Sequence, residues 1–398
     1  MILTAFEFEN YKAFPGRERI DIKPLTILIG KNSAGKSAVA RLPVLLAHGM
    51  ASDLDSPLEL NAGGVDFGSS LVDLIHDKSP HGSVGLSVEL DLDGKQHRFS
   101  WNLQHFDEYR MFTVSEFATG ISGDLHKWHW RGGDPIKHAG TYRIGQEDVT
   151  LKFTGLLPNV KPSIIDSRKL SKGLTYLGPF REKPQRFYRF PSGHAHDVGH
   201  AGANAPALLG SDVLRRKGEV LSAVGEWFQT YLGGWALDLV KHGDSFSLVL
   251  RNPKNASVEV NIADTGTGIA QVLPIVVQRQ FEALTGAGMG LEIVEQPELH
   301  LHPAAHGDLA DLYIEAVKRT NTRFIVETHS ENFLLRTQLR VAEGKLDPNK
   351  VAIYWVDNGT IQSIKLNERG DLSSWPEGVF SEDFEEVRRI RNAQKGKR

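Results

Sequence analysis

The residues best suited to chemistry begin with a loop of eight, Gly30-Lys-Asn-Ser-Ala-Gly-Lys-Ser37. The loop matches the pattern G-x-x-x-x-G-K-[ST] in full, between an apolar run over residues 25–29 and a helical pattern over residues 37–48. Glycines in such a loop let main-chain N–H groups curl around a phosphate, and the start of the following helix adds positive charge. The sequence therefore predicts nucleotide-phosphate binding by the whole loop: Gly30, Lys31, Asn32, Ser33, Ala34, Gly35, Lys36 and Ser37.

Two side chains of this loop have distinct predicted roles. Lys36 is expected to reach the β- and γ-phosphates of ATP, and the Ser37 hydroxyl is expected to bind Mg²⁺. Such a site also needs a carboxylate at the end of a neighbouring strand. Residues 291–295, Leu-Glu-Ile-Val-Glu, form a strand-like apolar run that ends in an acid. Glu295 is therefore predicted to be the second Mg²⁺ ligand.

The residue after Glu295 is an amide where a hydrolytic carboxylate is expected. Gln296 can orient water through hydrogen bonds, but it cannot accept a proton as a general base. Glu298 is a partial substitute, with a geometry that Pro297 leaves open. His329 follows another apolar run, residues 323–327, and is predicted to contact the γ-phosphate and the attacking water. The sequence therefore predicts firm ATP binding and slow hydrolysis.

The elements that position these residues are clearest after residue 266, where helical and strand patterns alternate. Helices are expected at 268–285, 304–319 and 331–343, and strands at 291–295, 323–327 and 350–356. This alternation favours a parallel α/β core. Glu295 lies roughly 260 residues after the phosphate loop, so the core must be split by a large insertion.

The insertion combines strand, loop and helix patterns. A β-hairpin is predicted over residues 82–103 around Asp93-Gly94, with further strands over 141–154. Gly, Pro, Arg and His crowd the predicted loop at 178–206, and helical structure with an apolar stripe is expected over 206–232. A second hairpin is predicted over 245–262.

Composition limits the classes of partner. The 398 residues carry a net charge of −3, so any contact with nucleic acid must come from a local patch. One candidate is the basic end at 388–398, for which a solubilising end is the alternative. No apolar run reaches the length that spans a bilayer, and no cysteine is present. We therefore expect a cytoplasmic protein without membrane contact.

Taken together, the motifs resemble a known family. The phosphate loop, Glu295-Gln-Pro-Glu-Leu-His-Leu-His-Pro303 and Glu327-Thr-His-Ser330 are similar, in this order and separation, to the ATPase heads of the ABC class. That class includes RecF-like, structural-maintenance-of-chromosomes (SMC) and OLD-type proteins. Phe8–Phe14 and Gly370–Phe380 resemble stand-alone bacterial AAA-type ATPases of the OLD-like, defence-associated branch. The family's glutamine loop has no match, because Val65–Leu71 contains no Gln.

The resemblance implies an α/β fold: an ABC-ATPase head with a parallel P-loop core, an antiparallel β subdomain and a helical insertion. It also implies an ATP-sandwich homodimer, with a higher oligomer left open. In such a dimer a signature segment of one subunit caps the γ-phosphate bound by the other. Asp264–Gln271 is similar to that segment, which gives Thr265, Gly266, Thr267 and Gly268 phosphate-binding roles. Ala270 replaces a common Ser, so the hydroxyl that faces the phosphate is left open, and a plain helix cap is the alternative.

Five segments follow from these predictions. Residues 1–48 carry the first part of the core and 49–160 a β-rich insertion. Residues 161–262 supply a loop, helix and hairpin, residues 263–360 the second part of the core, and 361–398 a C-terminal segment.

The function implied is a Mg²⁺-dependent ATPase that controls a separate effector protein, a nuclease or toxin, in defence against phage or mobile DNA. The alternative is a repair or chromosome-maintenance ATPase that clamps DNA directly. Basic and aromatic residues between Arg181 and Arg189 offer either a nucleic-acid contact or a packed loop with salt bridges. His300, His302 and His306 are predicted to contact the partner subunit, with a metal site as the alternative.

Overall fold

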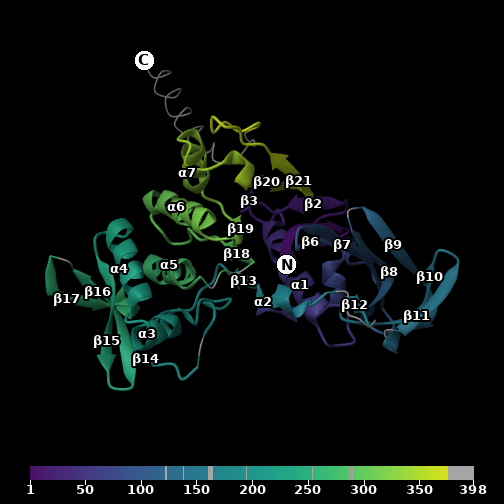
Figure 1. Cartoon of the computed structure of the whole chain (residues 1–398), viewed down its shortest axis with the longest axis horizontal. Coiled ribbons are helices and arrows are strands. Elements are labelled where there is room, and N and C mark those ends of the chain that lie inside the picture. The colour runs from purple at the N-terminus through teal and green to yellow at the C-terminus, as the bar shows by residue number, and fades with distance from the viewer. Residues whose placement is uncertain are drawn as a thin grey trace, which may run out of the picture.

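A computed structural model describes residues 1–374, apart from residues 122, 138, 160–164, 194, 253, 287 and 289. Within them the strands form two large sheets, a small sheet and a short two-stranded ribbon, and the helices pack between and beside the sheets (Figure 1). The basic end at 388–398 and residues 375–380 of the C-terminal resemblance lie outside the described residues.

The parallel sheet lies at the centre of the molecule. In the described chain its order is β13 (Leu174–Leu177), β18 (Leu291–Glu295), β19 (Arg323–Glu327), β3 (Leu25–Gly30), β20 (Val351–Asp357) and β21 (Thr360–Ile364). The first five strands run parallel, and β21 pairs antiparallel with β20. Along β3, Leu28 packs into one hydrophobic core while Ile27 and Ile29 pack into the other. Burial on both faces explains the continuous apolar runs of these strands.

The antiparallel sheet lies beside the parallel one. Its order among the described residues is β12 (Leu157–Pro158), β11 (Glu147–Thr154), β10 (Ala139–Ile144), β9 (Asp124–Asp134), β8 (Met111–Ile121), β7 (Lys95–Phe106), β6 (Ser83–Leu92), β1 (Ile2–Glu9) and β2 (Glu18–Asp21). The predicted hairpin around Asp93-Gly94 is confirmed as β6 and β7. Both turn residues have positive φ, 53° and 85°, as a tight hairpin turn requires. β1 joins this sheet by pairing with β6.

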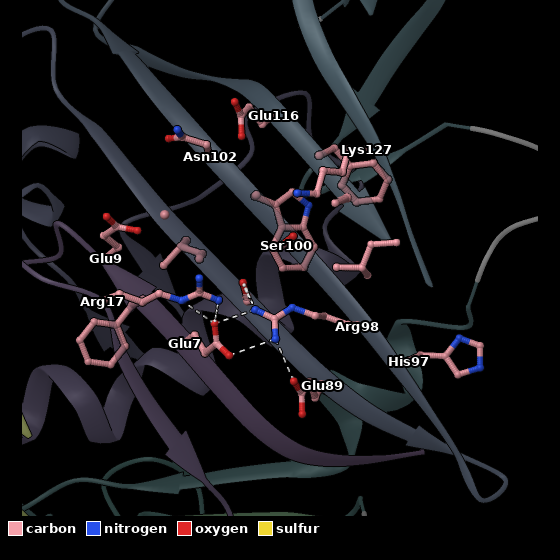
Figure 2. A pocket seen from close by; sticks show the side chains of 18 of the residues that line it. Glu7, Glu9, Arg17, Glu89, His97, Arg98, Ser100, Asn102, Glu116 and Lys127 are labelled. Atoms are coloured by element: carbon pink, nitrogen blue, oxygen red, sulfur yellow. Dashed lines mark hydrogen bonds and ion pairs between the residues drawn. The ribbon is translucent and has the colours of Figure 1, made fainter. Parts of the chain in front are cut away.

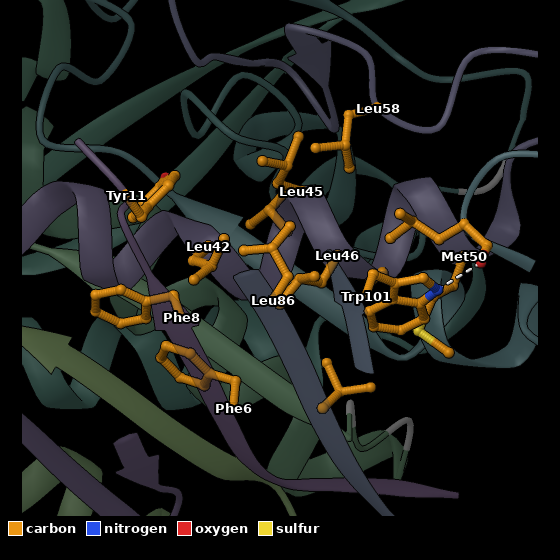
Figure 3. Close-up of a cluster of buried hydrophobic side chains, with 14 of the residues drawn as sticks. Phe6, Phe8, Tyr11, Leu42, Leu45, Leu46, Met50, Leu58, Leu86 and Trp101 are labelled. Carbon is orange, nitrogen blue, oxygen red and sulfur yellow. Dashed lines mark hydrogen bonds between the residues drawn. The ribbon is translucent and has the colours of Figure 1, made fainter. Parts of the chain in front are cut away.

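Helix α1 (Lys36–Ala51) fills the space between the two sheets. Leu42, Leu45 and Leu46 on α1 meet Phe6 and Phe8 of β1 in one buried cluster (Figure 3). Side chains alternate across a strand, so Phe6 and Phe8 face the helix while Glu7 faces the opposite side. The antiparallel sheet therefore holds the helix that begins with Lys36.

The outer face of the antiparallel sheet forms a hollow of about 650 Å³, lined by residues of β1 and β6–β9. Figure 2 shows Glu7 at its base, between Arg17 and Arg98. Arg19 also donates to Glu7, at 2.7 Å. The carboxylate is thus surrounded by guanidinium groups.

The other face of the parallel sheet is covered by helices and the small sheet (Figure 1). The helices are α3 (Ala205–Arg215), α4 (Glu219–Tyr231), α5 (Thr267–Thr285), α6 (Pro303–Arg319) and α7 (Glu331–Ala342). The small sheet contains β14 (Tyr188–Arg189), β15 (Ala236–His242), β16 (Ser245–Asn252) and β17 (Asn255–Asn261). No helix of the described chain is long and apolar enough to cross a membrane.

Short elements complete the described fold. They are α2 (Arg168–Lys172), the ribbon of β4 (Asn61–Ala62) and β5 (Val65–Asp66), and 3₁₀ helices at Leu71–Leu74, His76–Lys78, Pro135–Lys137, Ile262–Asp264 and Pro348–Lys350.

From residue 266 onward, the predicted helices and strands agree with the structure to within one residue at each end. The helical structure predicted over 206–232 is confirmed, but it is divided into two helices, α3 and α4. Lys217 and Gly218 between them both adopt left-handed backbone conformations, with φ of 59° and 80°. Two consecutive left-handed residues end an α-helix, and glycine makes the second one inexpensive.

Candidate functional site

The predicted site residues meet at one edge of the parallel sheet. β13, β18, β19 and β3 are neighbours and run parallel, so their carboxyl ends lie together. The phosphate loop follows β3, Glu295 ends β18 and Glu327 ends β19. The Cα atoms of Glu295 and Glu327 are direct partners in the register of β18 and β19. Pairing in the sheet thus joins segments that are far apart in the sequence.

The phosphate loop has the local geometry that its glycines allow. Gly35 precedes α1 in a left-handed conformation, with φ of 100°, and a Cβ there would lie 2.9 Å from the ring of Phe14. The Lys36 ammonium donates to the main-chain oxygens of Gly30 at 3.0 Å and Lys31 at 2.7 Å. Burial lowers the pKa of Lys36, while Glu327 and Glu298 oppose that shift. The cation is therefore enclosed by the loop and close to two carboxylates.

Glu295 is buried, and both of its carboxylate oxygens accept hydrogen bonds. Arg41, one turn after Ser37 on α1, donates Nε to Oε1 at 2.6 Å and Nη2 to Oε2 at 2.7 Å. The Tyr176 hydroxyl at the end of β13 donates to Oε1 at 2.9 Å. The structure therefore places Glu295 at the predicted edge, but its carboxylate is bonded to Arg41 and Tyr176 and not to Ser37.

Glu327 is the acid that contacts the phosphate loop. The Ser37 hydroxyl donates to Glu327 Oε1 at 3.0 Å. Oε2 of the same carboxylate is buried, and no donor among the described residues reaches it. Burial, reinforced by the neighbouring Glu295 charge, raises the pKa of Glu327 to about 7, against the effects of Ser37, Lys36 and Arg41. No role of its own was predicted for Glu327.

Gln296, His329 and Glu298 lie around the same edge. Gln296 has φ of 44°, and its N–H donates to the Glu327 main-chain oxygen at 2.7 Å. The N–H of His329 donates to Glu298 Oε1 at 2.7 Å, and Glu298 Oε2 is buried without a partner in the described structure. Burial, with a smaller effect of Lys36, lowers the pKa of His329 to about 4, so its imidazole is neutral at pH 7. Burial raises the pKa of Glu298.

The predicted signature segment forms the start of α5. Gly266 caps the helix, and Thr267 is its first residue and exposed to solvent. The Thr265 hydroxyl donates to the Ile262 main-chain oxygen at 2.7 Å. A Cβ on Gly268 would lie 2.6 Å from the main-chain oxygen of His300, so this glycine permits close packing on the loop after β18. Thr267 is thus the hydroxyl of the pair that is free to meet a ligand from solvent.

Arg181 joins the signature helix to the end of β18. It is 5% exposed, and its guanidinium donates to the main-chain oxygens of Gln271 at 3.2 Å and Glu295 at 2.9 Å. Burial lowers the pKa of Arg181 to about 10. Of the two interpretations of the loop between Arg181 and Arg189, the packed one fits these contacts. Arg186 also fits it, because it forms an ion pair with Asp264.

Of the three histidines after β18, His302 and His306 make local hydrogen bonds, while His300 is exposed. His302 Nδ1 accepts the N–H of Ala304 at 3.2 Å, which caps α6. His306 contacts the Ser330 hydroxyl through Nδ1 at 2.8 Å and the Leu301 main-chain oxygen through Nε2 at 3.2 Å. No group of three or more His, Cys, Asp or Glu residues in the described part of the chain is arranged to hold a metal ion.

Sequence reasoning missed Arg41, Tyr176 and Glu327 as site residues. Arg41 follows Ser37 by four residues and so shares its helix face, which is a signal the sequence contains. Glu327 ends its strand as Glu295 does, but only the register of β18 and β19 shows that the two carboxylates are neighbours. Tyr176 needs the placement of β13 beside β18.

The residues at this edge suit Mg²⁺. The available donors are oxygen atoms, the Ser37 hydroxyl and the unpartnered Oε2 of Glu327. Mg²⁺ prefers oxygen ligands and is usually bound by one or two carboxylates together with substrate phosphates. The donor set therefore fits the ion.

Comparison with known proteins agrees with this geometry. Residues 229–334, which include Glu295 and His329, match the family described as "AAA ATPase domain". The OLD nuclease of Thermus scotoductus is 21% identical over 346 residues, which cover 83% of this chain and 60% of that protein. The chain therefore spans less than two thirds of this relative.

Solved structures with a similar fold include SMC head domains. The SMC head bound to the C-terminal winged-helix domain of ScpA has a TM-score of 0.52 and 11% identity, covering 92% of this chain and 99% of that one. The SMC head of Thermotoga maritima has a TM-score of 0.44 and 12% identity, covering 92% of this chain and 100% of that one. Together with the phosphate loop and the paired strand ends, the match to the AAA ATPase domain, the OLD nuclease relative and the SMC head with a TM-score of 0.52 support a P-loop ATPase of the ABC class that resembles the RecF, SMC and OLD-like group.

Proposed function

We propose that the chain binds ATP with Mg²⁺ at the edge of the parallel sheet, hydrolyses it slowly, and uses the bound state to control a separate effector protein. The observation that carries the proposal is the direct link between the phosphate loop and the strand ends. Ser37 of the loop donates to Glu327, and the buried ammonium of Lys36 lies near Glu327 and Glu298.

The loop residues would hold the phosphates. The main-chain N–H groups of Gly30–Ser37 and the start of α1 favour an anion, and Lys36 can exchange its main-chain oxygen partners for phosphate oxygens. Ser37 and the carboxylates of Glu295 and Glu327 form the set from which Mg²⁺ ligands would be drawn. A bound Mg²⁺ would supply positive charge against the β- and γ-phosphates, including the charge that develops on the leaving ADP.

Hydrolysis would be limited by the group that handles water. The Gln296 amide can orient water but cannot take its proton. The neutral imidazole of His329 can hydrogen-bond to the attacking water. Glu298 accepts the main-chain N–H of His329, and it is the carboxylate that could assist in activating the water. We therefore expect ATP to remain bound for a long time in each cycle.

A second copy of the chain would complete the site. The start of α5, with Thr265, Gly266, Thr267 and Gly268, offers N–H groups and hydroxyls to the γ-phosphate held by its partner. The solvent exposure of Gly266 and Thr267 supports contact with another subunit. We expect a dimer with ATP, and the histidine segment 300–306 near its interface.

The effector and the biological role are the finer part of the proposal. The resemblance of the sequence motifs to the OLD-like, defence-associated branch motivates defence against phage or mobile DNA as the setting, and the similarity to an OLD nuclease is compatible with that branch. In the solved SMC head complex the head binds the winged-helix domain of ScpA, which supports docking of a separate protein on a head of this fold. A nuclease or toxin encoded nearby is the effector we propose.

Steady-state ATP turnover of wild type, Gln296→Glu and Glu298→Ala tests the slow switch. We expect slow wild-type turnover, a clear increase in Gln296→Glu and a further decrease in Glu298→Ala. Light scattering in ATP and in ADP should show a dimer only with ATP. Fast wild-type turnover that Gln296→Glu leaves unchanged would contradict the proposal.

Direct DNA clamping is tested separately. Affinity for duplex DNA should be measured with and without ATP over a range of salt concentrations. A clamp gains affinity with ATP and loses it steeply as salt rises. Our proposal expects weak binding that ATP does not change.

A further inference from the structure

We propose that Glu327, and not Glu295, is the carboxylate that binds Mg²⁺ beside Ser37, while Glu295 positions Arg41. The inference rests on the proposed nucleotide function and assigns the metal ligand within that site.

The contact with Ser37 is the first reason. Ser37 is the loop hydroxyl that would bind Mg²⁺, and it donates to Glu327 Oε1 at 3.0 Å. A carboxylate at this distance from the hydroxyl can share a cation with it after a small adjustment. The corresponding contacts of Glu295 are to Arg41 and Tyr176.

The second reason is the unpartnered oxygen of Glu327. Its Oε2 is buried, and no hydrogen-bond donor of the described chain reaches it. Only 1% of the surface of Glu327 is exposed to solvent. A buried polar atom without a partner is costly, so such an atom in a native fold calls for a ligand or an ion. A bound cation would satisfy it.

Glu295, by contrast, is fully engaged. Its two oxygens accept three hydrogen bonds, two from Arg41 and one from Tyr176. Moving this carboxylate to a metal would leave the guanidinium of Arg41 without its partner and close to a second cation. Glu295 is therefore a positioning residue, because it holds α1 against β18 through Arg41.

Glu298 also has an unpartnered buried oxygen, but its place is different. Its other oxygen accepts the main-chain N–H of His329. That contact directs Glu298 toward the segment after β19, where a water molecule would be handled, while Glu327 contacts the phosphate loop itself.

Mn²⁺ binding in the presence of saturating ADP tests the assignment without reference to turnover. Free Mn²⁺ is measured by its electron paramagnetic resonance signal for wild type, Glu327→Gln, Glu327→Asp and Glu295→Gln. We expect Glu327→Gln to weaken Mn²⁺ affinity by about tenfold or more, and Glu295→Gln to weaken it by much less. Glu315→Gln, on the exposed face of α6, is the matched control and should equal wild type.

Nucleotide binding in EDTA, followed with a fluorescent ADP analogue, reports an intact loop in each variant. Should Glu327→Gln fail to fold, Glu327→Asp decides: weakened Mn²⁺ affinity supports the inference, and wild-type affinity overturns it. Equal Mn²⁺ affinity in Glu327→Gln and wild type, or a larger loss in Glu295→Gln, also overturns it. Absence of nucleotide binding in wild type would reject the proposed function as a whole, which is a distinguishable result.

Discussion

Two buried carboxylates, one in each large sheet, differ in their hydrogen-bond donors and in the direction of their pKa shifts. Glu7 at the base of the outer hollow receives hydrogen bonds from Arg17, Arg19 and Arg98 (Figure 2). Burial alone would raise the pKa of Glu7, but these hydrogen bonds outweigh it and lower the pKa to about 2. Glu327 has one hydroxyl donor, and burial raises its pKa to about 7.

The difference separates a structural carboxylate from one kept for a ligand. The three guanidiniums around Glu7 satisfy its charge and join β1 to β7 through Arg98, to β2 through Arg19, and to the segment before β2 through Arg17. Glu327 keeps an unpartnered oxygen beside the phosphate loop, at some cost to the folded state. Substitutions at the two sites should therefore act on different properties.

Removing the loop cation should have the largest effect. We expect Lys36→Ala to reduce ATP turnover by about 10²–10³-fold, because a charge-stabilising donor to the phosphates is lost. Thermal unfolding should change little. The control is Lys318→Ala, an exposed lysine on α6 that pairs with Glu315. Wild-type turnover in Lys36→Ala would show that the phosphate loop does not act on ATP as we propose.

Glu7→Gln should destabilise the fold without affecting the nucleotide. Loss of the charge removes the carboxylate that the three arginines share, while Arg19 and Arg98 keep their ion pairs with Glu89. We expect about 2 kcal/mol less free energy of unfolding at pH 7. Urea denaturation measures this loss, and ADP affinity should stay at the wild-type value. Glu116→Gln, in the same hollow but exposed, is the matched control.

The stabilisation that Glu7 provides should depend on pH. The pKa of Glu7 lies at about 2 in the folded state against an ordinary value of 4.5. Its stabilising contribution is therefore present above pH 4.5 and is lost as pH falls through 2. The difference between wild type and Glu7→Gln should shrink steadily in urea denaturation at pH 7, 4 and 3. A constant difference would contradict the assigned cause.

Glu327→Gln should act in the opposite direction on stability. With a folded pKa of about 7 against 4.5, the folded state gains stability from the proton below pH 4.5 and loses it as pH rises through 7. Without metal or nucleotide at pH 8, we expect the neutral variant to be more stable than wild type by about 1 kcal/mol. A loss of stability as large as that of Glu7→Gln would show that Glu327 is a structural carboxylate like Glu7.

The smallest effect is expected where an ion pair is exposed. Arg168 and Asp53 form such a pair at 2.7 Å, with 65% and 78% of their side chains exposed. Arg168→Ala should change the free energy of unfolding by less than about 0.5 kcal/mol. A larger change in urea denaturation would show that solvent exposure does not limit the contribution of this ion pair to stability.

Local sequence signals predicted the parts of the site that lie in continuous motifs. The loop Gly30–Ser37, the strand ending at Glu295 and the segment around His329 each carry their own pattern, and apolar runs located their strands. The confirmed α/β fold, with its parallel core and antiparallel subdomain, follows from those patterns and from the family resemblance. The roles assigned to the individual site residues stay predictions.

Contacts set by strand pairing could not be predicted in this way. No local pattern indicates that β1 pairs with β6, that Glu327 lies beside Glu295, or that Arg181 reaches the start of α5. The break between α3 and α4 is a local feature at Gly218, but the apolar stripe continues across it and does not indicate where the first helix ends. Long-range register therefore decides which carboxylate meets Ser37.

Binding of Mg²⁺-ATP at the phosphate loop is best tested by calorimetric titration of the wild-type chain with ATP, in Mg²⁺ and in EDTA. We predict one ATP per chain, with tighter binding when Mg²⁺ is present. No binding at millimolar ATP, or binding that Mg²⁺ and Lys36→Ala both leave unchanged, would contradict it.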